Sequence, residues 1–242
     1  MPQFFIDKPI ETGSEIEIKG SDAHHINDVL RLRKGDWLVL SDGKGNSYRA
    51  TLVSAGKKAV EARITEEIRR KAGALPPCLA FAVIKHDRSE WIIQKAVELG
   101  CRHIIPYYCN RTIPKFKSAD KKIDRWRDIA AGAAKQSGLF FLPQIDQPAQ
   151  FGKLCGRLSQ YSKTLLFWEG EQKTGLRDAL HGLRPEILVV VGPEGGFDSS
   201  EIDNAVAAGA TTVSLGQQIL RVETAALTAL AIVQYELENL SL

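Results

Sequence analysis

Hydrophobic and polar residues alternate over short runs in the first third of the chain. Turn signals such as DGKGN and AGKK separate these runs, which are QFFI, EIEI, WLVLS, SYRATLVS and AVEARITEEI. A helical pattern, SDAHHINDVLRLRKGD, interrupts them, with Ser21 or Asp22 as the expected N-cap and Gly35 after its end. The pattern predicts a small β-barrel or a curled sheet over residues 1–72.

The pattern changes after RRKAGALPPCLA, where apolar runs begin to alternate with helical stretches. The predicted strands are LAFAVI, HIIPYY, TLLFWEG, EILVVVG and TTVSL. In the helix that follows the first strand, Asp87 and Glu90 have the spacing of a capping box, and Gly100 is the expected end. Strands that alternate with helices form a parallel sheet with helices on both faces. Residues 73–242 are therefore predicted to be an α/β domain.

Two loops of this domain follow strands directly, where ligands of parallel sheets bind. The first, GPEGG, contains Gly192 and Gly195, whose backbone a ligand can approach closely. The alternative is that these residues only turn the chain into a helix capped by Asp198 or Ser199. The second loop, LGQQILRVET, places Ile219 and Leu220 where a solvated connection is expected. Together the two loops predict a pocket with apolar walls.

The last helix begins with more polar groups than a helix start needs. Arg221, Glu223 and Thr224 stand directly before an apolar stretch that begins at Ala225, although one capping oxygen is enough. Arg221 and Glu223 are therefore candidates for a pocket. The alternatives are that Thr224 caps the helix and that Arg221 pairs with a carboxylate.

Composition narrows the class of protein. The chain has 242 residues, of which 44% are hydrophobic and 25% charged, as in soluble globular proteins. No apolar run reaches the length of a membrane span, and the start of the chain does not resemble a signal peptide. The four cysteines form no CxxC pair, and the five histidines have no metal-binding spacing. We expect a cytoplasmic protein without a metal site.

The net charge of +3 is small, but basic residues cluster. A tract between Arg111 and Arg127 is suited to neutralising phosphates, and further basic residues follow the helix of the first domain. The candidate RNA contacts are Arg31, Arg33, Arg111, Lys121, Lys122 and Arg125. The alternatives are a solvated helix face with internal ion pairs for the tract, and a favourable helix dipole for the first-domain residues.

VGPEGGFDSSEI followed by LGQQILRVETAALTAL resembles the closing motifs of the SPOUT methyltransferases, specifically the RsmE-type enzymes that methylate uridine N3 in 16S ribosomal RNA. Further matches are HHINDVLRLRKGD, DGKGNSYRA, KHDRSEWIIQKAVELGCRHIIPYYCNRT and AAKQSGLFFLPQI. The resemblance implies an α/β fold with a SPOUT-type parallel sheet and a C-terminal trefoil knot, preceded by a PUA-like β-barrel that binds RNA. It also implies S-adenosylmethionine as cofactor, a homodimer, and 16S rRNA in the small ribosomal subunit as partner.

The resemblance also implies roles for residues. Leu215, Ile219 and Leu220 would hold the adenine largely by backbone, opposite Gly192 and Leu166, and Arg221, Glu223 and Thr224 would line the methyl-transfer side. The complete expected cofactor site is Leu166, Gly192, Glu194, Gly195, Leu215, Gly216, Ile219, Leu220, Arg221, Thr224 and Ala225.

The chemistry of the reaction limits the roles of these residues. Uracil N3 is a poor nucleophile until its proton is lost, so a base and a cation would help. Glu223 is the candidate base and Arg221 the candidate cation, with Glu194 as a weaker candidate base.

Alternatives remain at this level. Another SPOUT enzyme could methylate a ribose 2′-hydroxyl or a tRNA guanine, and a non-catalytic ribosome assembly factor could keep the same fold. Gln3, Lys135 and Leu139 or Phe140 depart from the residues usual in the family at these places. These departures leave the cofactor motifs intact but weaken any transfer of RNA contacts to their positions.

Overall fold

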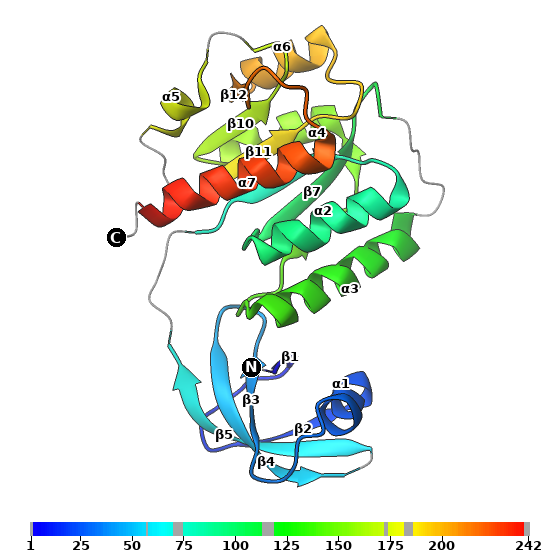
Figure 1. Ribbon diagram of the computed structural model, residues 1–242, viewed down its shortest axis with the longest axis vertical. Coiled ribbons are helices and arrows are strands. Elements are labelled where there is room, and N and C mark those ends of the chain that lie inside the picture. Colours follow the sequence, from blue (N-terminus) through cyan, green and yellow to red (C-terminus); the bar gives the residue numbers. More distant parts are fainter. Residues whose placement is uncertain are drawn as a thin grey trace. The chain divides into compact units, whose positions relative to one another are not determined.

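The computed structural model describes residues 2–56, 58–69, 75–112, 119–171, 174–181 and 186–239. The chain forms two compact units, which are drawn in Figure 1. Unit 1 comprises Met1–Ala72 and Ala134–Leu142, and unit 2 comprises Gly73–Ala133 and Pro143–Leu242. The predicted domains were continuous, so the assignment of residues 134–142 to unit 1 is a difference from the prediction.

Unit 1 is built on a five-stranded sheet in the order β1-β3-β4-β5-β2. Its strands are β1 (Gln3–Phe5), β2 (Glu15–Lys19), β3 (Trp37–Ser41), β4 (Ser47–Ala55) and β5 (Ala59–Ile68). Alternate residues of β2 and of the first half of β5 are buried, as the sequence pattern predicts for a half-buried sheet. Two register shifts between β4 and β5 bend this pair, which agrees with a curled sheet.

One helical segment crosses unit 1, as predicted, but it starts and ends differently. The segment begins as α1 (Gly20–His24) after Lys19, so Ser21 and Asp22 lie inside the helix and neither caps it. It continues as a π-helical turn, η1 (His25–Val29), which buries Ile26. Arg31 then adopts a φ of 56°, and this left-handed conformation ends the segment before Gly35.

Residues 134–142 contact the rest of unit 1 through polar groups. Lys135 Nζ lies 2.8 Å from Asp22 Oδ1, and Gln3 Nε2 donates to the carbonyl oxygen of Leu139 at 2.5 Å. Ser41 Oγ donates to the carbonyl oxygen of Phe140 at 2.7 Å. The positions that depart from the family pattern therefore lie together, and the side chains of Gln3 and Lys135 bind protein groups.

Unit 2 contains a seven-stranded sheet in which every described pair of strands is parallel. Its order is β12-β10-β11-β6-β7-β8, and β9 also pairs with β7. The strands are β6 (Cys78–Ala82), β7 (His103–Tyr108), β8 (Gln144–Ile145), β9 (Ala149–Gln150), β10 (Lys163–Phe167), β11 (Ile187–Val191) and β12 (Ala210–Val213). All residues of β6 and β11 are buried, as expected for central parallel strands. The predicted parallel sheet is confirmed.

Helices cover both faces of this sheet. They are α2 (His86–Glu98), α3 (Ala119–Ser137), α4 (Phe151–Cys155), η2 (Leu158–Gln160), α5 (Leu176–Leu180), α6 (Ser199–Ala207) and α7 (Val222–Asn239). α7 packs against β6, β11 and α2. Phe151 of α4 and Ile202 of α6 belong to a core cluster with Leu188 and Val190 of β11. The trefoil knot concerns the threading of the chain and stays a prediction.

The capping predictions for unit 2 had mixed outcomes. Asp198 caps α6 in a capping box with Glu201, as the sequence predicted for Asp198. In α2 the helix already begins at His86, after Lys85, and has no side-chain cap, so the capping box with Asp87 is wrong. Gly100 ends α2 with a φ of 84°, as predicted. No helix in the described residues is long and apolar enough to cross a membrane.

A polar cluster ties β7 to the segment after β8. His103 Nε2 lies 2.8 Å from Asp146 Oδ1, and Arg157 Nη1 lies 2.7 Å from Asp146 Oδ2. Burial alone would lower the pKa of His103, but its hydrogen bonds with Asp146 and Cys78 outweigh burial and raise the pKa to about 9. Burial opposes ionisation of Asp146 too, yet His103 and Arg157 hold its pKa well below the usual value. His103 starts β7, so this cluster stabilises the amino end of that strand.

Candidate functional site

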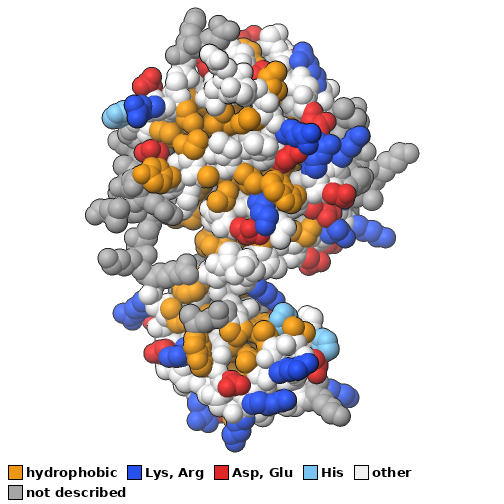
Figure 2. Space-filling view, in the orientation of Figure 1, with side chains coloured by type: hydrophobic (Ala, Val, Ile, Leu, Met, Phe, Trp, Pro, Cys, Tyr) orange, Lys and Arg blue, Asp and Glu red, His pale blue; other side chains and the backbone are white. Residues whose placement is uncertain are grey.

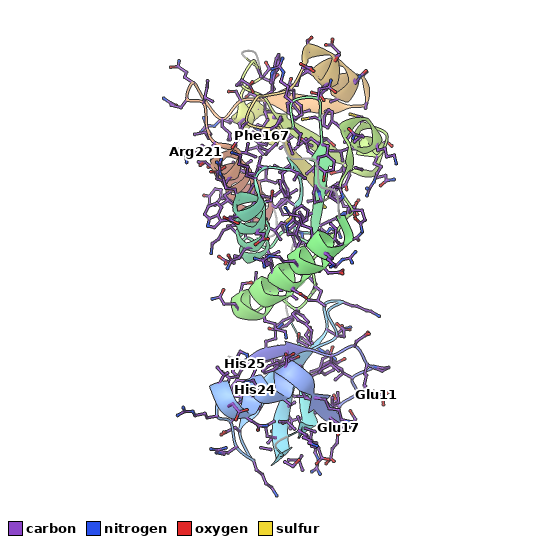
Figure 3. All side chains as sticks on the ribbon, turned by 90° about the vertical axis from the view of Figure 1, so that its right-hand side faces the viewer. Glu11, Glu17, His24, His25, Phe167 and Arg221 are labelled. Atoms are coloured by element: carbon purple, nitrogen blue, oxygen red, sulfur yellow. The ribbon has the colours of Figure 1, made fainter. Side chains whose placement is uncertain are left out.

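Three neighbouring strands of unit 2 end at the same level. Phe167, the last residue of β10, pairs with Val191 at the end of β11 and with Val213 at the end of β12. The strands are parallel, so the loops that follow them emerge on the same edge of the sheet. Those after β11 and β12 carry most of the predicted cofactor residues, and Leu166 lies one position before the end of β10. Figure 3 marks Phe167 and Arg221 in this unit.

The loop after β11 has glycines for reasons of packing as well as access. A Cβ atom on Gly192 would lie 2.7 Å from the ring of Phe197. Gly196 has a φ of 69°, and a Cβ atom there would lie 2.2 Å from the carboxylate of Glu169. Local packing therefore accounts for glycine at positions 192 and 196. Gly195 meets only ordinary contacts, the nearest with Arg111, so its lack of a side chain leaves backbone accessible.

Charged side chains from distant parts of unit 2 fix this loop. Glu194 forms an ion pair with Arg88 of α2. The Nη1 atom of Arg111 donates to the carbonyl oxygen of Gly195 at 2.8 Å, and its Nη2 atom lies 2.8 Å from Asp198 Oδ1. The carboxylate of Glu194, a predicted cofactor contact and the weaker candidate base, is therefore already paired with an arginine. Arg111, a predicted RNA contact, is bound to the loop after β11, which is called the glycine loop below.

The loop after β12 exposes apolar groups. Gly216 has a φ of 118°, which a residue with a side chain rarely adopts, and its turn is stabilised by Ser214 Oγ. Leu215 and Leu220 are half-buried, whereas the Ile219 side chain is 87% exposed. An isoleucine this exposed in the loop that follows β12 is suited to contact a ligand or another chain.

The start of α7 leaves its polar side chains available. The helix begins at Val222, and Ala225 N donates to the carbonyl oxygen of Arg221 at 2.8 Å. Thr224 therefore lies in the first turn, so the alternative that it caps the helix is wrong. The structure records no ion pair for Arg221 among the described residues. Glu223 Oε2 is buried, and no described group forms a hydrogen bond with it. A buried carboxylate oxygen without a partner is uncommon and calls for an explanation.

The candidate RNA residues of unit 2 differ in how far they are paired. Arg125 forms two hydrogen bonds with Glu90, at 2.6 and 2.8 Å, which agrees with the ion-pair alternative. Burial lowers the pKa of Lys122 to about 8, although Glu90 and Asp87 act in the opposite direction. Lys121 is exposed. Lys115 and Lys117 of the same tract lie outside the described residues.

The candidate RNA residues of unit 1 line a hollow of about 620 Å³. Its wall consists of Asn27, Asp28, Arg31, Arg33 and Ala55. Within the described chain, neither Arg31 nor Arg33 forms an ion pair, whereas Arg49 and Arg63 of the same unit are bound to glutamates. The guanidinium groups of Arg31 and Arg33 are therefore available to an anionic ligand.

Comparison with known proteins identifies the chain. Residues 73–234 match the RNA methyltransferase domain, and residues 18–65 match the RNA methyltransferase PUA domain. The chain belongs to the RNA methyltransferase family. Ribosomal RNA small subunit methyltransferase E of Bacillus subtilis is 32% identical over 252 residues, covering 99% of this chain and 98% of the relative. The enzyme of that name from Mycobacterium bovis is 30% identical, covering 95% and 90%.

A solved structure from the RNA methyltransferase family extends the likeness to three dimensions. The crystal structure of ribosomal RNA small subunit methyltransferase E from Neisseria gonorrhoeae, bound to S-adenosyl methionine, is 32% identical to this chain. It covers 97% of both chains with a TM-score of 0.88. The predicted fold, with a PUA-like domain before the methyltransferase domain, is confirmed, and S-adenosylmethionine is the cofactor of this family. No group of acidic, histidine and cysteine residues in the described part of the chain could hold a metal ion.

Sequence reasoning missed the residues that fix the glycine loop. Arg88 and Glu194 are 106 positions apart, and Asn110 and Asp198 are 88 apart. No local pattern could have paired them, because their contact depends on the order of strands in the sheet. Glu169, which faces Gly196, was also missed, although it follows β10 by two residues.

Proposed function

We propose that this protein methylates N3 of a uridine in 16S ribosomal RNA of the small subunit, with S-adenosylmethionine as methyl donor. The observation that carries the proposal is the common end of β10, β11 and β12, in register at Phe167, Val191 and Val213. The two loops that follow β11 and β12 bear the motifs of the RNA methyltransferase family, and the likeness to its rRNA-modifying members covers nearly the whole chain.

The residues at this edge fit the cofactor. Leu215, Ile219 and Leu220 offer apolar surface and backbone groups to the adenine. Gly192 and Leu166 are buried, so they would contribute to the opposite wall only through their backbone. Ile219 is exposed in the chain as it stands and would be covered by the bound molecule. Thr224 and Ala225 lie one helical turn away from Arg221, on the side where the methyl group would be presented. Binding would therefore bury apolar surface that is now in water.

The chemistry needs a proton acceptor and a positive charge. When bound, the cofactor supplies an electrophilic methyl group on a positively charged sulfur. Glu223 accepts the proton from uracil N3, and its buried Oε2, free of hydrogen bonds from described groups, has the capacity to do so. Arg221 stabilises the negative charge that develops on the uracil oxygens. The rest of the rate comes from holding the nitrogen in line with the methyl group.

RNA is bound by both units in this proposal. The guanidiniums of Arg31 and Arg33 in unit 1, which form no ion pair with the described residues, neutralise phosphates, and so do Lys121 and Lys122 of α3. Arg125 contributes less, because it already binds Glu90 in two places. The assembled small subunit presents the target uridine in a fixed shape, which favours it over free RNA as the substrate.

The test uses purified protein, labelled S-adenosylmethionine and small subunits that lack the modification. We expect label on a uridine base as 3-methyluridine when the nucleosides of the 16S RNA are separated. Free 16S RNA serves as the comparison and should accept much less label. Label on a ribose or a guanine, or no label in this RNA from protein that binds the cofactor, would overturn the assignment.

A further inference from the structure

The turn after β7 reaches the glycine loop across another strand. β6 lies between β7 and β11 in the sheet, so the ends of β7 and β11 are not neighbours. Tyr107 of β7 nevertheless donates its hydroxyl hydrogen to the carbonyl oxygen of Val191 at 2.8 Å. Ala82 of β6 is the register partner of Tyr107, and this small side chain belongs to the same core cluster. This hydrogen bond holds Val191, the last residue of β11, to β7.

Asn110 and Arg111, which follow β7, also bind the glycine loop and the start of α6. Arg111 binds the Gly195 carbonyl oxygen and Asp198 Oδ1, both at 2.8 Å, and Asn110 Nδ2 donates to Asp198 Oδ2 at 2.9 Å. The backbone N–H of Asn110 donates to Glu201 Oε1 at 2.9 Å. Glu201 is buried, and its other oxygen accepts from the N–H of Asp198. We call Asn110 and Arg111 the loop clamp.

The loop clamp is itself held in shape. Thr112 Oγ1 accepts from the N–H of Cys109 at 2.9 Å, and the N–H of Thr112 donates back to the carbonyl oxygen of Cys109 at 3.0 Å. The Thr112 side chain is buried. The turn therefore presents Asn110 and Arg111 in one arrangement before any ligand binds.

The glycine loop needs such support. Gly195 and Gly196 have no side chains to restrict their backbone, and Gly196 has a φ of 69°. A free segment of this kind samples many conformations and would lose that freedom when a ligand binds. Ties that fix the loop in advance remove this cost and strengthen binding.

We propose that Asn110 and Arg111 are positioning residues that hold Gly195–Asp198 in the shape that binds the methyl donor. The inference rests on the proposed function, because that function supplies the ligand of the glycine loop. It assigns Arg111 to cofactor affinity instead of RNA contact. The two roles predict different effects of the same substitutions, since Lys keeps the charge of Arg but cannot bind two acceptors in a fixed fork.

Calorimetric titration of the full chain with S-adenosylmethionine tests the loop clamp, using Arg111→Ala, Arg111→Lys and Asp198→Asn. Asn is also a good N-cap, so Asp198→Asn weakens the ion pair and keeps the cap of α6. We expect Kd to rise about tenfold in Arg111→Ala, because a charge-assisted, two-pronged contact is lost. Lysine should restore little of this affinity, and Asp198→Asn should weaken binding in the same direction. Arg127→Ala, which removes an exposed arginine of α3, is the matched control and should leave Kd unchanged.

Hydrogen exchange of the cofactor-free chain gives a second measurement. The amides of residues 195–198 should exchange faster in Arg111→Ala than in wild type, while those of β6 stay the same. Wild-type Kd and wild-type exchange in Arg111→Ala would overturn the loop clamp. A normal cofactor Kd with weaker RNA binding and a smaller salt slope would assign Arg111 to RNA instead.

Failure of the proposed function gives a different result. If folded wild-type protein did not bind S-adenosylmethionine, the proposed function would fall, while the exchange measurement would still report on the loop clamp. If Arg111→Ala did not fold, Arg111→Lys would decide. This variant keeps the charge, and a wild-type Kd in it would contradict the need for a two-pronged contact.

Discussion

Arg221 and Glu223 stand two positions apart at the start of α7, yet their side chains lie in different surroundings. Arg221 is exposed, whereas Glu223 is half-buried and has its Oε2 shielded from water without a described hydrogen-bond partner. Side chains two positions apart at a helix start do not face each other, and the structure shows no ion pair between Arg221 and Glu223. In the proposed function, both groups act on the substrate that is bound beside the loops after β11 and β12.

Replacing Arg221 by alanine tests its role on the transferring side. We expect turnover of methyl transfer to fall by about 10²- to 10³-fold, the usual effect of removing one group that stabilises developing charge. Cofactor affinity should change far less, because the charge that Arg221 stabilises appears only during the reaction. Single-turnover transfer at saturating cofactor, together with calorimetric Kd, separates the two effects. Arg177→Ala, another exposed arginine of unit 2, is the control.

Glu223→Gln distinguishes between two roles of the carboxylate. If Glu223 is the base, the substitution removes it, and turnover should fall as in Arg221→Ala. Near-normal turnover would contradict Glu223 as the base, and the proton would then have another acceptor. A parallel loss of Kd and turnover in Arg221→Ala would contradict a role confined to the transferring side.

At the scale of helices and strands, periodicity predicted the order of elements but not all their starts. The alternation of strands and helices after residue 73 is as expected, because buried parallel strands need continuous apolar runs. The cap of α6 was predicted correctly, since Asp198 is followed three residues later by Glu201. The predicted caps of α1 and α2 were wrong. The non-helical residue before each helix is Lys19 or Lys85, so each helix starts one or two residues before the polar residue that the pattern favours.

The basic residues on α3 and near η1 differ in whether they already form ion pairs with acidic side chains. Reversing the charge of Lys121, Arg31 and Arg33 together should weaken RNA binding and reduce the salt dependence, by about 0.7 to 0.9 in slope per lost phosphate contact. Cofactor Kd should not change, because these residues are not among those at the strand ends. Reversing Lys19, Arg49 and Arg63 together, each of which is paired with a glutamate, gives a matched change of charge in unit 1. RNA binding measured at several salt concentrations checks the prediction, and an equal effect of this control would show that only net charge matters.

At the scale of the molecule, the sequence could not predict contacts between distant segments. Residues 134–142 comprise the end of α3 and the segment after it, although most of α3 belongs to unit 2. Lys135, Leu139 and Phe140 of this segment bind groups in the first 72 residues of unit 1. The loop clamp likewise depends on the placement of β6 between β7 and β11. The family resemblance assigns the cofactor to the loops after β11 and β12 because its motifs are local, and this assignment stays a prediction. Contacts that support the loop after β11 join residues 84 to 106 positions apart, and one sequence carries no signal of such pairings.

The exposed side of α7 carries a stripe of uncharged residues. Thr224, Thr228, Ala231 and Tyr235 follow one another at helical spacing and carry no charge, although a solvated helix face usually does. Tyr235 is 65% exposed. Figure 2 shows hydrophobic side chains gathered over the face of unit 2 on which Figure 1 draws α7 and α2. We infer that a second copy of the chain covers this stripe in a twofold homodimer.

Light scattering at micromolar protein concentration should give the mass of a dimer. Ala231→Glu places a charge in the middle of the uncharged stripe, and burying it unpaired in a twofold interface would be strongly unfavourable, because it would occur once in each copy. We expect this variant to be monomeric and to lose methyl transfer, since the stripe begins at Thr224 beside the proposed site. Val206→Glu is the matched control, because Val206 is 49% exposed on α6, on the other face of the sheet. A monomeric wild type, or a dimeric Ala231→Glu variant with full activity, would contradict an interface on α7.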